Sequence, residues 1–158
     1  MPGNYKLLSR LMIEMQLTLA VAESVTAGYI QYLCSGAPDA ASFFQGGITV
    51  YNSAQKFKHL GVEPICALKK DGVSPGISQT LARNCCQMFS SHIGLGITGF
   101  ADARSSPEKE AYAFLSIWVR DEEIIAEKLY SRSQVFPEIQ IDFSRQALDI
   151  LTRVLSGQ

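Results

Sequence analysis

The chain has 158 residues, of which 47% are hydrophobic, and 14 Lys and Arg residues stand against 15 Asp and Glu residues for a net charge of -1. This length and apolar fraction suit one folded domain over residues 1–158 and argue against intrinsic disorder. Because no run of Lys or Arg occurs, the sequence gives no indication of a nucleic-acid or anionic membrane surface.

The first half of the chain predicts two strands and three helices. Apolar residues at helical spacing predict an amphipathic helix over 4–15. Residues 17–22, LTLAVA, have no polar face and predict a short strand that is buried on both sides. A helix over 26–36, a β-branched strand over 46–52 and a short helix over 53–61 follow.

The second half begins with a helix start, because Ser74 can cap a helix whose first residue is Pro75. The elements predicted after this start are a helix to about 91, a strand at 93–98, a loop at 99–110, a hairpin of strands at 111–119 and 123–131, and a helix at 137–156. The alternation of helices and strands predicts an α/β protein, a three-layer α/β/α sandwich whose sheet the hairpin makes mixed.

Targeting and membrane signals are weak in this sequence. No apolar stretch approaches the roughly 18 residues of a membrane span. The N-terminal segment is a poor signal peptide, because Ser9, Arg10 and Glu14 interrupt its apolar core. We therefore expect a cytoplasmic protein with no nucleic-acid or membrane partner.

The four cysteines do not predict a metal site. Cys34, Cys66, Cys85 and Cys86 form no C-x-x-C pair, and the chain has only two histidines. Reduced thiols, most of them buried, are the expected state.

Small and polar residues directly follow three of the predicted strands. They lie in the segments 23–28 (ESVTAG), 51–56 (YNSAQK) and 98–101 (TGFA). Because ligand sites of open α/β sheets form beyond the carboxyl ends of the strands, we expect these segments to converge on one site.

Ser24 is the candidate nucleophile of that site. A serine hydroxyl needs a base, and neither His59 nor His92 lies in the three segments. A lysine kept neutral by burial can serve instead, so Lys56 is the candidate base and the Tyr51 hydroxyl a candidate proton relay.

Purely structural roles explain the same residues. Ser24 or Thr26 would be an N-cap, and Glu23 would only stabilise a helix N-terminus. Lys56 would lie in solvent on its helix, as most lysines do. Two glycines would serve backbone geometry alone, namely Gly28 and Gly99.

The three segments, in this order, resemble the CinA C-terminal domain family, whose members include nicotinamide mononucleotide amidases. The family's A-E-S-C-T-G-G turn appears as AESVTAG at 22–28, and its G-x-x-x-Y-S/N-N-x-x-K motif as GITVYNSAQK at 47–56. Further parallels are LGV at 60–62, DGVS at 71–74, TGFADAR at 98–104 and RQA at 145–147.

The resemblance implies an α/β/α fold, a homodimer, and hydrolysis of the carboxamide of nicotinamide mononucleotide to the acid and ammonia, with no cofactor or metal. It would make Ser24 the nucleophile, activated by Lys56 and Tyr51. The substrate-binding residues would be Glu23, Thr26, Gly28, Thr98, Gly99 and Arg104.

Departures from the family pattern concentrate in the glycine-rich loop. Its glycines, which let backbone N–H groups wrap an anion, are replaced over 102–106 by DARSS. Asp102 would repel a phosphate, Arg104 would bind one, and Tyr112 would fill part of the pocket. These changes favour an alternative, a catalytically inactive paralogue that binds a nucleotide or a protein partner.

Overall fold

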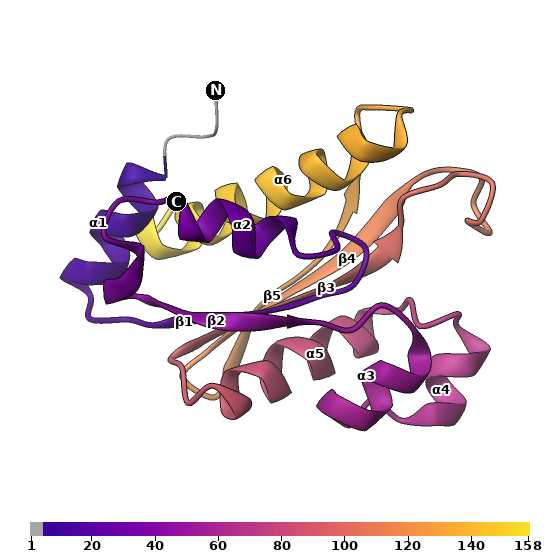
Figure 1. Cartoon of the computed structure of the whole chain (residues 1–158), viewed down its shortest axis with the longest axis horizontal. Coiled ribbons are helices and arrows are strands. Elements are labelled where there is room, and N and C mark those ends of the chain that lie inside the picture. The colour runs from indigo at the N-terminus through magenta and orange to yellow at the C-terminus, as the bar shows by residue number, and fades with distance from the viewer. Residues whose placement is uncertain (1–4) are drawn as a thin grey trace.

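A five-stranded sheet forms the centre of the computed structural model, which describes residues 5–158 (Figure 1). Its strands are β1 (Leu19–Glu23), β2 (Phe44–Thr49), β3 (Ile93–Phe100), β4 (Tyr112–Val119) and β5 (Glu122–Tyr130). The spatial order is β2-β1-β3-β4-β5, in which β1 pairs in parallel with β2 and β3 while β4 and β5 are antiparallel. The mixed sheet predicted from the sequence is confirmed.

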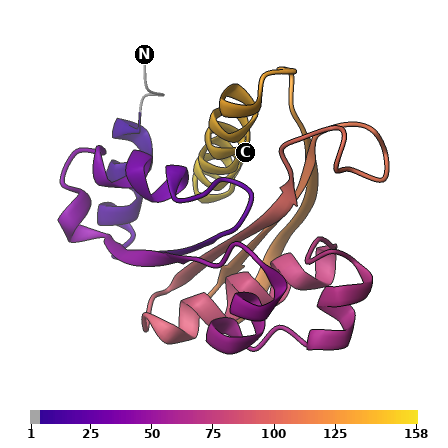
Figure 2. The same ribbon diagram turned by 45° about the vertical axis from the view of Figure 1, so that its right-hand side comes forward.

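Helices cover both faces of the sheet, which confirms the three-layer α/β/α architecture (Figures 1 and 2). One face carries α1 (Lys6–Glu14), α2 (Tyr29–Ser35) and α6 (Phe136–Ser156), and the other carries α3 (Ser53–Leu60), α4 (Pro64–Lys69) and α5 (Pro75–Met88). A 3-10 turn, Ala40–Ser42, precedes β2. The predicted start of the first helix at Asn4 lies outside the described residues.

Two apolar cores follow from this layering. The larger packs β1 and β3–β5 against α1, α2 and α6, and its fully buried members include Phe43 and Phe143. The smaller lies under α3–α5 and includes Ile77 and Leu81. All five residues of β1 are buried, as the absence of a polar face predicts.

Two glycines of β3 bring α5 directly onto the sheet. A Cβ atom at Gly94 would lie 2.0 Å from the Ala82 carbonyl oxygen, and one at Gly96 would lie 2.4 Å from both the Ala82 nitrogen and the Ser78 carbonyl oxygen. Because the neighbours are backbone atoms of α5, only glycine fits at this spacing.

Several element boundaries differ from the predictions. Helix α4 was not predicted, although Pro64 stands at its start and the Glu63 side chain accepts hydrogen bonds from two of its N–H groups. β2 ends at Thr49, so the backbone leaves the sheet before Tyr51. The predicted hairpin is confirmed, and Arg120 and Asp121 both have positive φ, typical of a two-residue type I′ turn.

No helix within residues 5–158 combines the length and the apolar character that crossing a membrane requires.

Candidate functional site

The turn between β1 and α2 is organised by the buried Glu23 carboxylate. It accepts hydrogen bonds from the Thr26 hydroxyl at 2.5 Å and from the backbone N–H groups of Gly28, Ile30 and Gln31 at 2.8 to 3.1 Å. A carboxylate is favourable there because the first N–H groups of a helix have no intrahelical partners and carry partial positive charge. Glu23 thus takes the structural role that the sequence left open, and it fixes the position of the residue that follows β1.

Ser24 is that residue. It lies at the carboxyl end of β1, and its backbone N–H donates to the Ile97 carbonyl of β3. The turn then closes through Ala27 at φ 51° and Gly28 at φ 96°, which sends the chain back over the sheet as α2. The hydroxyl of Ser24 therefore sits at an edge where neighbouring strands also end.

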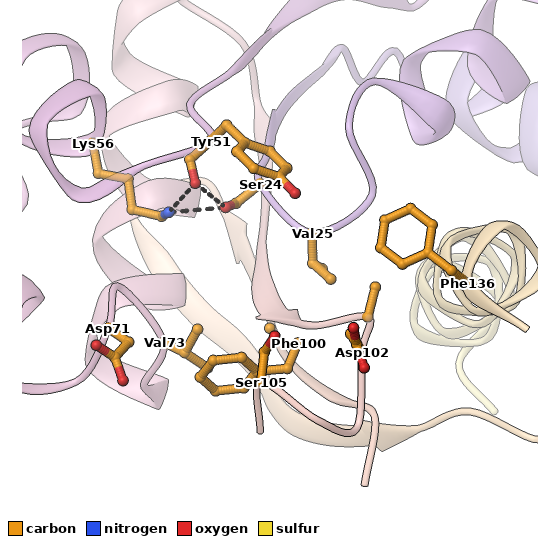
Figure 3. A pocket seen from close by; sticks show the side chains of 12 residues that line it. Ser24, Val25, Tyr51, Lys56, Asp71, Val73, Phe100, Asp102, Ser105 and Phe136 are labelled. Atoms are coloured by element: carbon orange, nitrogen blue, oxygen red, sulfur yellow. Dashed lines mark hydrogen bonds between the residues drawn. The ribbon is translucent and has the colours of Figure 1, made fainter. Parts of the chain in front are cut away.

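Lys56 reaches Ser24 from α3. It lies in the first turn of α3, whose N-cap Asn52 accepts a hydrogen bond from the Gln55 N–H. Its Nζ donates to the Ser24 Oγ at 2.8 Å, and only 2% of the residue is exposed (Figure 3). Lys56 is therefore buried beside Ser24 and does not lie in solvent, as most helical lysines do.

Tyr51 enters the site through its backbone rather than its ring. Its carbonyl oxygen accepts hydrogen bonds from Lys56 Nζ at 3.2 Å and from Ser24 Oγ at 3.4 Å. The residue is 65% exposed. The predicted relay through the hydroxyl has no counterpart among these contacts, because the carbonyl takes the place beside the amine.

Burial lowers the pKa of Lys56 to about 8, because desolvation disfavours the ammonium form. Within residues 5–158 no carboxylate oxygen lies within 4.0 Å of its Nζ to oppose that effect. At pH 7 about a tenth of the amine is therefore unprotonated and able to accept a proton, and the fraction rises toward pH 8.

The turn between α4 and α5 packs against the Lys56 amine and is held there by Thr98, a contact that we call the clamp. The buried Thr98 hydroxyl donates to the Gly72 carbonyl at 2.6 Å. Gly72 has φ 73°, and a Cβ atom on it would lie 3.2 Å from Lys56 Nζ. Thr98 thereby holds the turn against the amine.

Thr98→Val should move the pKa of Lys56 upward, toward the ordinary value of about 10.4, because the released turn admits water. It should also destabilise the fold by about 1–2 kcal/mol, since the Gly72 carbonyl loses its donor. The pKa is read from an NMR titration of the lysine side chain. Thr98→Ser, which keeps the hydroxyl, and Thr152→Val, whose hydroxyl bonds only within α6, should leave it unchanged. An unshifted Lys56 in Thr98→Val contradicts the clamp.

A cavity of about 300 Å³ opens beside Ser24 and Lys56 (Figure 3). Its walls come from the turn after β1, the segment before α3 with the first turn of α3, the turn before α5, the end of β3 with the loop that follows it, and the first residue of α6. The lining residues are Ser24, Val25, Tyr51, Lys56, Asp71, Val73, Gly99, Phe100, Ala101, Asp102, Ser105 and Phe136.

The structure brings Ser24, Lys56, Tyr51 and Gly99 of the predicted set to this cavity. The other predicted residues do not line it: Glu23, Thr26 and Gly28 form the turn behind Ser24, Thr98 holds Gly72, and Arg104 pairs with Asp102. Tyr112 packs among Phe100, Phe114 and Tyr130 instead of filling the cavity.

Three lining residues, Asp71, Val73 and Phe136, lie outside the segments predicted to form the site. Asp71 precedes the predicted helix start at Ser74, and that proximity was the available signal. Phe136 reaches the cavity from the start of α6, 112 positions after Ser24, and no local pattern indicates its contribution.

The model of the CinA C-terminal domain matches residues 4–155. The chain belongs to this family. A CinA-like protein of Amoebophilus asiaticus is 32% identical over 154 residues, which are 97% of this chain and 37% of the relative. A relative from Moorella thermoacetica, named as a competence-damage inducible protein, is 33% identical over 144 residues, 90% of this chain and 34% of its own. The chain thus spans about a third of the length of these CinA relatives.

Solved CinA structures share the fold. A competence or damage-inducible protein of Enterobacter asburiae superposes with a TM-score of 0.89 at 20% identity, covering 98% of this chain and 97% of the other. The protein CihA of Agrobacterium tumefaciens gives 0.85 at 20% identity over 98% and 97%. At this identity the likeness establishes the α/β/α architecture alone.

Proposed function

We propose that this CinA-domain protein is an amidohydrolase of the nicotinamide mononucleotide amidase type, with Ser24 as nucleophile and Lys56 as base. The observation that carries the proposal is the 2.8 Å contact between a buried lysine amine and a serine hydroxyl at the wall of a cavity. A serine needs such a base, and the lowered pKa of about 8 makes Lys56 one.

The contacts suit the first chemical step. The Ser24 O–H turns from the Tyr51 carbonyl to the lone pair of the neutral Lys56 amine, which takes its proton as Oγ attacks the carboxamide carbon. The Tyr51 carbonyl keeps the amine oriented through its own hydrogen bond. The ammonium formed then returns the proton to the departing nitrogen, which leaves as ammonia, while the acyl group stays on Ser24 as an ester. Water activated by the same amine hydrolyses the ester, releasing the acid and restoring Ser24.

A donor for the developing oxyanion is close at hand. Val25 follows the nucleophile directly and lines the cavity. Within residues 5–158 its backbone N–H donates to no acceptor. The amide of the residue after a nucleophile is well placed to stabilise negative charge on the attacked carbonyl oxygen.

Ser24→Ala should reduce ammonia release from nicotinamide mononucleotide by at least roughly 10³-fold, because the amide then has no nucleophile to acylate. Purified protein is assayed for ammonia against Ser35→Ala, a serine at the exposed end of α2 that should keep the full rate. An active wild type with an equally active Ser24→Ala variant rejects the serine assignment while leaving amidase activity in place.

The loop after β3 favours a second candidate, a catalytically inactive paralogue that binds a nucleotide or a protein. Asp102 lines the cavity where the family resemblance leads one to expect glycines. Calorimetry separates the two candidates, because a binding protein takes up the mononucleotide with no ammonia released. If the protein neither binds nor hydrolyses the mononucleotide, the result favours a protein partner.

A further inference from the structure

The charges that line the cavity are mostly negative. Its charged side chains are Lys56, Asp71 and Asp102, so the formal charge is -1 with Lys56 protonated and -2 when Lys56 is the neutral base. In Figure 3 the two carboxylates lie across the cavity from the Ser24–Lys56 pair. Within residues 5–158 no arginine lines the cavity.

Arg104, the cation of the 99–106 segment, is turned to Asp102. Its Nε donates to both carboxylate oxygens of Asp102 at 3.0 and 3.1 Å, and its Nη2 donates at 2.7 Å. The Arg104 side chain is 91% exposed, whereas that of Asp102 is 30% exposed. Asp102 thus engages the Nε–Nη2 edge of the guanidinium, and moving that edge to a phosphate would leave Asp102 unpaired beside the phosphate.

Aromatic rings complete the cavity wall. Tyr51, Phe100 and Phe136 line it together with the carboxylates (Figure 3). Faces of such rings attract organic cations, and carboxylates add to that attraction. A phosphate monoester carries a charge of about -1.5 to -2 near neutral pH and would be repelled by the same walls.

We propose that the cavity selects a carboxamide on a planar, positively charged ring that carries no phosphate, the class of the pyridinium nucleosides. This inference rests on the proposed amidase function and names its substrate class. Asp102 acts as the specificity-determining residue, because it places a carboxylate in the cavity and holds Arg104 outside it.

The test compares nicotinamide riboside with nicotinamide mononucleotide, which differ by the phosphate. We expect kcat/KM for ammonia release to favour the riboside by about tenfold, the size of one like-charge contact near a protein surface. Asp102→Asn should narrow that ratio by improving the mononucleotide, because it removes a carboxylate and frees Arg104. Asp39→Asn, which replaces a carboxylate before β2 at the far end of the sheet, should leave the ratio unchanged.

Calorimetry on Ser24→Ala protein gives a second reading that needs no turnover. Tighter binding of the riboside with no ammonia from the wild type would sustain the charge selection and reject the amidase. Equal or better use of the mononucleotide, with a ratio that Asp102→Asn does not move, would sustain the amidase and overturn the selection. Binding of neither compound overturns both.

Discussion

Lys56→Met should abolish ammonia release and, below about pH 8, make the protein more stable. The loss of rate follows from the loss of the base beside Ser24, an effect of roughly 10²–10⁴-fold. Lys56→Arg should be equally inactive, because a guanidinium stays protonated. The rate of the wild type should rise with pH through about 8 and level off above it, as the amine loses its proton.

The gain in stability has a separate cause. The folded chain releases the Lys56 proton near pH 8, whereas the unfolded chain keeps it to about 10.5. Between pH 8 and pH 10.5 the unfolded state binds more protons than the folded state, so the free energy of unfolding rises with pH. Below pH 8 the fold bears the full cost of burying the ammonium. At about 1.4 kcal/mol per pH unit, the buried charge costs the fold on the order of 3 kcal/mol at pH 7, and Lys56→Met recovers that amount less the two hydrogen bonds of the amine.

Denaturant unfolding at pH 7 and pH 10, together with the ammonia assay, measures both effects. Lys58→Met is the matched control, since Lys58 is an exposed neighbour on α3 and should change neither rate nor stability. A Lys56→Met variant less stable than the wild type at pH 7 contradicts the buried ammonium. An active Lys56→Arg variant rejects the lysine as base, whatever the stability shows.

Gly96→Ala should destabilise the fold by about 3 kcal/mol or more, at the upper end of what overpacking produces. The new methyl group would lie 2.4 Å from two backbone atoms of α5, so no side-chain rotation relieves it and the helix must move off the sheet. That shift would also disturb the turn before α5, where Gly72 packs against Lys56.

Chemical denaturation of Gly96→Ala is compared with Gly76→Ala in the first turn of α5. A Cβ atom at Gly76 meets only the Ser74 Oγ at 4.0 Å. That variant should be neutral or stabilised by about 0.5–1 kcal/mol, because alanine loses less backbone entropy in a helix. If Gly96→Ala unfolds at the denaturant concentration of the wild type, α5 does not rest on β3 as closely as described.

The layers of this protein could be predicted from its sequence because they depend on local pattern. Apolar runs without a polar face indicated buried strands, and helical spacing indicated one-sided helices. The Ser74-Pro75 start and the hairpin could be recognised within a few residues. Short α4 was missed, since six residues give too little periodicity to identify a helix.

The site depended partly on local pattern and partly on tertiary packing. Strand ends indicated that Ser24, Lys56 and Tyr51 would converge, but not that the Tyr51 carbonyl, rather than its hydroxyl, would meet the amine. The burial that lowers the pKa of Lys56 arises because the Gly72 turn, held by Thr98, covers it from a distant segment. Arg104 could be read as a phosphate ligand because residue type alone does not show that the loop turns its guanidinium onto Asp102, two positions earlier in the chain.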